Sequence, residues 1–214
     1  MKLKKTDYIA LLVLIATFVQ LIIVYPSLPE QVVTNWGFDG EVSYAGKSTL
    51  WILWGMNALL LPLFFVIPKI DPKGKSYAKV DTFYTTFRLV MIIFLAGMLE
   101  ITILSANDPH RFDVGKIVMI AMSLLLMFMG NYLPKCKKSF TLGIKNMWTL
   151  SDERVWNETH RLGGIIFFVA GVLMLVSTFI FTEELNAVIT MVLIFGSVIA
   201  TSVYSYILYK KYNG

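Results

Sequence analysis

The sequence predicts an all-α membrane protein: a bundle of six transmembrane helices, with both termini in the cytoplasm and a short interfacial helix before the fifth span. The first observation is composition, because 57% of the 214 residues are hydrophobic, 15% are charged and the mean hydropathy is +0.68. These values are far too apolar for a soluble domain of this size. The second is a set of apolar runs, each long enough to cross about 30 Å of hydrocarbon. The runs show no alternation with a period of two residues, so they predict helices rather than a β-barrel.

The predicted spans follow one another along the whole chain. They cover approximately residues 8–24, 50–67, 87–104, 116–133, 162–181 and 187–208. Lys2, Lys4 and Lys5 precede the first run as in a signal peptide, but this run is longer than a typical signal sequence and no A-x-A-like cleavage site follows it. We therefore expect a retained helix.

The distribution of positive charge predicts the orientation. The N-terminus, residues 68–88, residues 134–161 and the C-terminus hold 16 of the 19 lysines and arginines. The positive-inside rule then places both termini in the cytoplasm. We expect an N-terminal three-helix half at 1–111 with a compact external loop at 26–49, and a C-terminal half at 112–214 with a cytoplasmic loop at 130–164.

Cysteine and charge exclude two classes of protein. The single cysteine, Cys136, cannot form an internal disulfide, and the neighbouring lysines favour the reducing, cytoplasmic side. The pI near 9.2 is high enough for a nucleic-acid-binding protein, but the basic residues are scattered among loops beside apolar runs. We expect the lipid bilayer as a partner and no direct contact with nucleic acid.

The predicted external loop reads YPSLPEQVVTNWGFDGEVSYAGK. Pro26 and Pro29 end the first helix, Asn35 and Trp36 are expected at an interface, and the glycines, including Gly40, permit tight turns. This pattern predicts a compact loop. The alternative is a simple membrane-anchored turn whose aromatic residues belong to an interfacial belt.

The cytoplasmic loop ends in a polar, aromatic segment, residues 148–164. Ser151 is a candidate helix cap, so a helix is expected to start near Asp152. Its apolar face, which includes Trp156, is narrow, and we expect the segment to lie along the headgroups with Trp148 and Trp156 as anchors. The helix can continue through Gly163 and Gly164 into the fifth span.

This loop resembles the SdpI family of bacterial membrane proteins, named for an immunity protein against a peptide killing factor. In that family a Gly-Asn-x-x-Pro helix end precedes Gly-Ile-Arg-Thr-Pro-Trp-Thr-Leu, an acidic helix with Val-Trp, and often Thr-His-Arg-x-Gly-Gly. The matching residues here are Gly130, Asn131, Pro134, Gly143, Ile144, Trp148, Thr149, Leu150, Val155, Trp156, Thr159, His160, Arg161, Gly163 and Gly164.

The sequence departs from the family pattern at Lys145, Asn146 and Met147, where Arg-Thr-Pro is usual. The first loop is similar to the accessory domain often found ahead of this motif, and it shares Leu28, Pro29, Trp36 and Gly40, with Asn35 where histidine is frequent.

The resemblance implies resistance to a secreted, membrane-active peptide toxin, which would be a partner. It also implies a receptor role, in which a winged-helix repressor is held at the cytoplasmic face of the membrane. The candidate partner-binding residues are those of the motif: Asn131, Pro134, Gly143, Lys145, Trp148, Thr149, Trp156, His160, Arg161 and Gly164. The basic loops at 69–79 and 135–138 are candidates for the same partner or for anionic lipid.

Glu100 is the most conspicuous polar residue inside a predicted span. A charged side chain at the bilayer centre costs about 2.5–3.5 kcal/mol on insertion scales, so function is the default interpretation. Asn57 or Gln20, on other spans, can share its site. The alternatives are a functional carboxyl group and a hydrogen-bonded glutamate that fixes helix packing.

The sequence contains no recognisable enzyme motif: HExxH, GxSxG and the Walker loop are absent. The two histidines, His110 and His160, fall on opposite sides of the predicted membrane, and Glu158 and His160 diverge on a helix. We therefore expect no catalytic residue, metal or cofactor. The alternatives to an immunity protein are a small proton-coupled transporter, with Glu100 as its coupling site, and a membrane-embedded enzyme.

Overall fold

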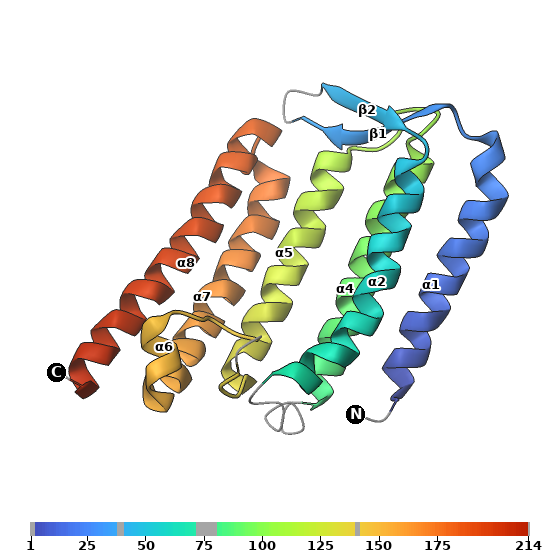
Figure 1. Ribbon diagram of the computed structural model, residues 1–214. Coiled ribbons are helices and arrows are strands. Elements are labelled where there is room, and N and C mark those ends of the chain that lie inside the picture. Colours follow the sequence, from blue (N-terminus) through green and yellow to red (C-terminus); the bar gives the residue numbers. More distant parts are fainter. Residues whose placement is uncertain (1–2, 38–40, 72–80, 140–141, 214) are drawn as a thin grey trace. The chain divides into compact units, whose positions relative to one another are not determined.

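The computed structural model describes residues 3–37, 41–71, 81–139 and 142–213. The chain divides into two compact units: unit 1 is Met1–Lys69 with Asp81–Gly115, and unit 2 is Ile70–Val80 with Lys116–Gly214. Within the described residues, six helices are long and apolar enough to cross a membrane (Figure 1). They confirm the six predicted spans and a mostly helical, multi-pass membrane protein: Lys5–Ser27, Thr49–Ile70, Thr82–Leu104, Val114–Lys135, Glu153–Ile180 and Glu183–Asn213.

Unit 1 contains three long helices. These are α1 (Lys5–Val24), which continues into the short helix η1 (Tyr25–Ser27), α2 (Thr49–Ile70) and α4 (Asp81–Leu104). Side-chain contacts join α1 and α4 at positions 81 and 80 residues apart in sequence, so these two helices run parallel. The helix α2 runs antiparallel to α4, since Phe64 bonds to Tyr84 and Asn57 bonds to Ile92.

A β-hairpin joins α1 to α2 (Figure 1). Strand β1 (Gln31–Trp36) pairs antiparallel with β2 (Val42–Gly46), with an irregularity between Val33 and Asn35. Val32 and Val33 are fully buried, and Val32 packs in a cluster with Leu21, Leu50 and Leu99. The hairpin lies within the predicted loop, and its two strands were not predicted, because the run of six residues in β1 shows no clear alternation.

Unit 2 contains α5 (Val114–Tyr132), the short helix η2 (Leu133–Lys135), α6 (Met147–Ser151), α7 (Glu153–Ile180) and α8 (Glu183–Asn213). At the tight connection between α7 and α8, the Ser177 hydroxyl donates to Asn186 Oδ1 at 2.6 Å and the Asn186 amide donates to Thr178 Oγ1 at 3.2 Å. These bonds satisfy polar groups that would otherwise be buried without partners.

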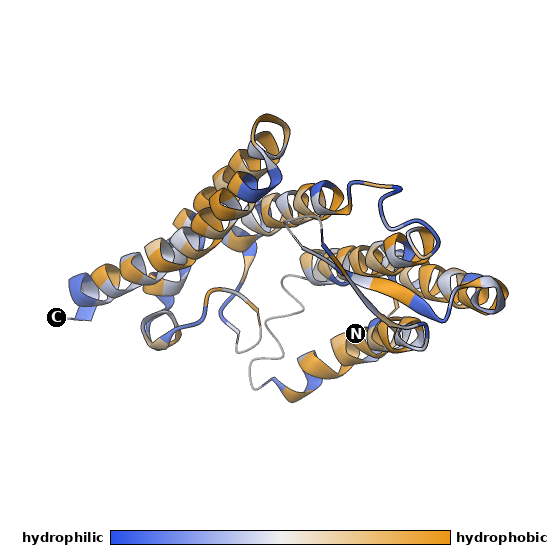
Figure 2. Ribbon diagram, turned by 90° about the horizontal axis from the view of Figure 1, so that it is seen from above, coloured by the Kyte–Doolittle hydropathy of each residue, from blue (hydrophilic) through white to orange (hydrophobic). Residues whose placement is uncertain are grey.

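The long helices are apolar along most of their length, as Figure 2 shows by hydropathy. On α8, side chains such as Val192, Phe195 and Ile199 are more than 60% exposed. In a membrane these faces contact lipid chains, so their exposure carries no penalty.

Of the predicted helix boundaries, the Ser151 cap is wrong and the start near Asp152 is confirmed. The short helix before the fifth span is α6, which ends at Ser151, so Ser151 caps nothing and its hydroxyl donates to Trp148 O. The helix α7 begins at Glu153, and its cap is Asp152, whose carboxylate accepts from the Arg154 amide at 2.7 Å. This helix continues through Gly163 and Gly164 into the fifth span, as expected, and is 28 residues long.

Candidate functional site

Trp156 and His160 are the buried centre of the motif in unit 2. Both project from α7 one turn apart, with 0% and 1% exposed surface, and their rings stack with centroids 4.0 Å apart. The Trp156 indole donates to Cys136 O at 2.9 Å, which ties α7 to the segment after α5. The prediction that Trp156 anchors in the headgroups is therefore wrong.

His160 fixes the second half of the loop. Its Nε2 accepts from the Ile144 amide at 2.9 Å, and its Nδ1 lies 2.7 Å from Trp156 O. A carbonyl oxygen only accepts, so Nδ1 must donate, and the hydrogen-bond pattern assigns a neutral imidazole protonated at Nδ1. Both ring nitrogens of His160 thus bond to backbone groups, of Ile144 and Trp156, and neither nitrogen is left for a substrate.

Gly143 has the left-handed φ of +109°. A Cβ atom there would lie 2.9 Å from the Trp156 ring and would also overlap His160 Nε2. Glycine is therefore required both for the backbone conformation and for the close approach to the two rings.

Close backbone approach also explains Gly130, Pro134 and Gly164. A Cβ atom on Gly164 would lie 2.7 Å from Gly130 O and 2.7 Å from the Pro134 ring. Gly171 lies about two turns further along the same face of α7. A Cβ atom there would lie 2.8 Å from Ser123 O on α5. These contacts show that α7 and α5 approach closely along this face, whereas Gly196 on α8 has nothing within 4 Å.

Asn146 begins α6 at the point where the sequence departs from the family pattern. Its Oδ1 accepts from the Thr149 amide at 2.9 Å, and its Nδ2 donates to Ser205 Oγ on α8 at 2.7 Å. Thr149 is fully buried and its hydroxyl donates to Ile144 O at 2.9 Å. The asparagine therefore caps α6 and attaches it to α8.

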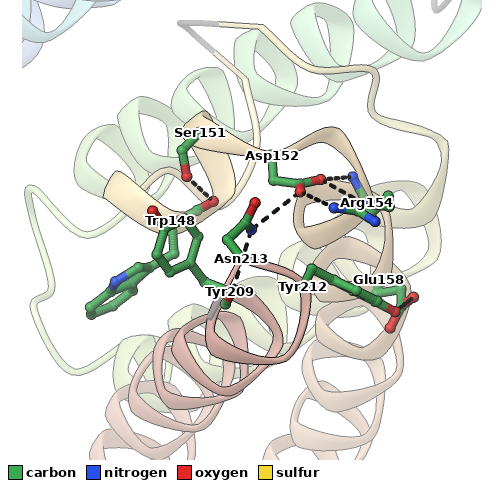
Figure 3. A network of polar contacts seen from close by, with 8 residues as sticks. All are labelled: Trp148, Ser151, Asp152, Arg154, Glu158, Tyr209, Tyr212 and Asn213. Carbon is green, nitrogen blue, oxygen red and sulfur yellow. Dashed lines mark hydrogen bonds and ion pairs between the residues drawn. The ribbon is translucent and has the colours of Figure 1, made fainter.

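The C-terminal end of α8 contacts the start of α7 (Figure 3). The Tyr212 hydroxyl donates to Glu158, and Asn213 donates to Asp152 Oδ2 at 3.3 Å. Hydrogen bonds from Arg154 hold the pKa of Asp152 well below its usual range. The Arg154 guanidinium also lies over the Tyr212 ring at 4.6 Å.

The motif residues thus separate into two groups. Gly143, Thr149, Trp156, His160 and Gly164 build the loop from inside. The side chains of Asn131, Pro134, Lys145 and Arg161 are exposed, and Trp148 is half-buried against Tyr206 with ring centroids 5.2 Å apart. Only this second group is available to a partner.

In unit 1, Gln20 and Glu100 meet between α1 and α4. Gln20 Nε2 donates to Glu100 Oε2 at 2.6 Å, which confirms one of the two predicted partners. The other is wrong, because Asn57 Nδ2 donates to Ile92 O at 3.2 Å and serves the packing of α2 against α4.

A second polar pair in unit 1 was missed. Asp7 on α1 and Arg88 on α4 form an ion pair with 3% and 0% of their side chains exposed. Arg88 Nε and Nη1 have no partner among the described residues, and the guanidinium lies 4.2 Å over the Phe65 ring. The sequence did contain a signal for this pair, because an acidic residue and a basic residue stand at the start of two apolar runs.

The predicted residues of the external loop are dispersed over the hairpin. The Trp36 indole donates to Pro109 O at 3.4 Å, Pro29 is half-buried and Asn35 is exposed. Gly40, like Lys73, Lys75 and Lys79 of the basic loop, lies outside the described residues.

The described parts of the chain offer neither a cluster of metal ligands nor a reactive thiol. No group of three or more His, Cys, Asp or Glu side chains there can hold a metal ion. Burial raises the pKa of the Cys136 thiol to about 12, so it stays protonated and a poor nucleophile.

Comparison with known proteins agrees with this division. The SdpI/YfhL protein family matches residues 135–208, and a domain of unknown function, DUF1648, matches residues 12–65. The chain is 24% identical to "Immunity protein SdpI" of Bacillus subtilis (strain 168) over 210 residues, which cover 98% of this chain and 99% of that protein. No solved structure matches the chain. The C-terminal part of the chain therefore matches the SdpI/YfhL protein family, its N-terminal part matches DUF1648, and nearly the whole chain is similar to one immunity protein.

Proposed function

We propose that the protein confers immunity to a secreted, membrane-active peptide toxin. The supporting observation is the similarity to an immunity protein over 98% of this chain, which includes both the hairpin region and the motif. The hairpin would face the outside and engage the toxin, and the motif loop would lie in the cytoplasm.

The hairpin offers a surface suited to an apolar peptide. Val32 and Val33 on β1 are buried, whereas Tyr44 on β2 is 52% exposed. An exposed aromatic ring on a short rigid strand provides contact area at a low entropic cost.

The test is survival of a toxin-sensitive strain that expresses the protein, measured at matched membrane levels. Wild type should protect, and Tyr44→Ala should weaken protection. Tyr8→Ala is the matched control, since Tyr8 is 61% exposed at the opposite end of unit 1. No protection by wild type against any peptide toxin of this class would contradict the proposal, and equal losses in the two variants would contradict the role of the hairpin.

A receptor function that holds a winged-helix repressor at the membrane is proposed as a second role of the exposed motif residues. Lys145→Gln and Arg161→Gln should then release the repressor while protection persists. Recovery of repressor in the membrane fraction measures this, and unchanged recovery in the double variant would argue against it.

A proton-coupled transporter is the rival function, and the bond between Gln20 and Glu100 is the observation that favours it. Intramembrane carboxyl groups often mark proton pathways. Proton flux in proteoliposomes that is lost in Glu100→Gln would favour transport, whereas full protection by the same variant would favour immunity.

A further inference from the structure

We infer that the end of unit 2 where α7 begins and α8 ends binds the headgroups of anionic phospholipids. This inference does not depend on the proposed immunity function. It rests on a group of exposed cationic side chains, here called the basic belt: Lys135, Lys137, Arg161, Lys210 and Lys211.

Contacts within unit 2 bring the members of the basic belt to one end. The bond from Trp156 to Cys136 O joins the segment that carries Lys135 and Lys137 to the start of α7. The bond from Tyr212 to Glu158 joins the end of α8 to the same part of α7. Arg154 is left out of the belt because its guanidinium is paired with Asp152.

The depth of the basic belt matches the phosphate level of a bilayer. Large exposed apolar residues on α8 extend from Leu185 to Ile207, which is about 33 Å along a helix and so close to the hydrocarbon thickness. Lys210 and Lys211 follow within about one turn. On α7, Arg161 likewise precedes the first exposed apolar residue, Ile165, by one turn.

Aromatic rings accompany the cations. Lys135 Nζ lies 4.7 Å from the Tyr132 ring, Lys210 Nζ lies 5.2 Å from the Tyr206 ring and Lys211 Nζ lies 5.4 Å from the Tyr212 ring. Tyrosine and tryptophan are enriched at the headgroup level of membranes, where one end of the side chain is apolar and the other is wet. This pairing favours a lipid over a protein that would dock further from the bilayer.

Charge complementarity specifies anionic lipid. The opposite end of unit 2 carries Glu183 and Glu184 in the first turn of α8 as well as Lys116, so the exposed cationic side chains are concentrated at the end with the basic belt. A basic residue at the surface of an anionic membrane contributes an affinity factor of about five.

The experiment compares lipid binding by the full chain in nanodiscs of phosphatidylcholine mixed with phosphatidylglycerol. Native mass spectrometry of the released protein gives the ratio of bound phosphatidylglycerol to phosphatidylcholine. Wild type should favour phosphatidylglycerol, and Lys210→Gln/Lys211→Gln should lower the ratio about fivefold or more. Lys210→Arg/Lys211→Arg should retain it.

The control is Lys47→Gln/Lys116→Gln, which removes the same charge elsewhere: Lys47 pairs with Glu30 in unit 1, and Lys116 lies by Phe179 at the other end of unit 2. An equal ratio in all variants overturns the inference. An equal loss in the control overturns the assignment to this end. A circular-dichroism spectrum and elution volume like those of wild type establish that each variant is folded.

Discussion

The two units hold their helices together with different kinds of polar contact. In unit 1, α1 and α4 are joined by pairs of side chains, Asp7 with Arg88 and Gln20 with Glu100. In unit 2, the motif side chains bond mainly to backbone groups, as Trp156 does to Cys136 O and His160 does to the Ile144 amide. Side-chain pairs therefore fix the register of two helices, whereas side-chain bonds to backbone groups can hold an irregular loop against one helix.

This contrast predicts the largest effect for Arg88→Leu, because the substitution leaves Asp7 buried without its counter-charge. We expect a loss of about 3–5 kcal/mol in the free energy of unfolding. Unfolding by SDS titration in mixed micelles measures it. Asp7→Leu/Arg88→Leu should recover most of the loss, and a double variant as unstable as the single one would contradict the buried pair.

Gly143→Ala should have the next largest effect, in unit 2. The new methyl group meets the Trp156 and His160 rings at a φ of +109°, and such backbone strain costs about 1–3 kcal/mol before any displacement of the rings. The same titration measures it. Gly55→Ala is the control, because nothing lies within 4 Å of that position. Equal stability of the two variants would refute the close approach.

His160→Leu should follow, because it leaves the Ile144 amide without an acceptor. An unsatisfied buried group costs about 1–3 kcal/mol. The exposed His110→Leu is the control and should stay within about 0.5 kcal/mol of wild type. Amide hydrogen exchange at Ile144 gives a second measurement, and unchanged protection there in His160→Leu would disprove the bond.

The smallest effect is expected for Gln20 and Glu100. Hydrogen bonds between membrane helices average about 0.6 kcal/mol in double-mutant cycles. A cycle of Gln20→Leu and Glu100→Leu should give a coupling energy near this value, and a cycle of Asn57→Leu with Glu100→Leu should give none. A coupling energy between Asn57 and Glu100 instead would contradict the assignment of Gln20 as the partner of Glu100.

The sequence alone determined the six spans, because hydropathy over some twenty residues is a local property that lipid enforces. It also indicated the resemblance to the SdpI family, because the motif from Gly130 to Gly164 is contiguous. The roles of the motif residues were partly misassigned. Tryptophan is typical of interfacial anchors, but packing against Cys136 and Gly143 buries Trp156 in the core.

The side-chain partners of the polar residues inside the spans depend on the tertiary structure. Gln20 and Asn57 were equal candidates for Glu100, since both are uncharged amides on neighbouring spans, and the rotation of each helix about its axis selected Gln20. The same rotation buries Asp7 with Arg88, although positive-inside counting had assigned Arg88 to a loop. Hydropathy fixes which segments enter the membrane, but the direction in which each face points depends on contacts between helices distant in sequence.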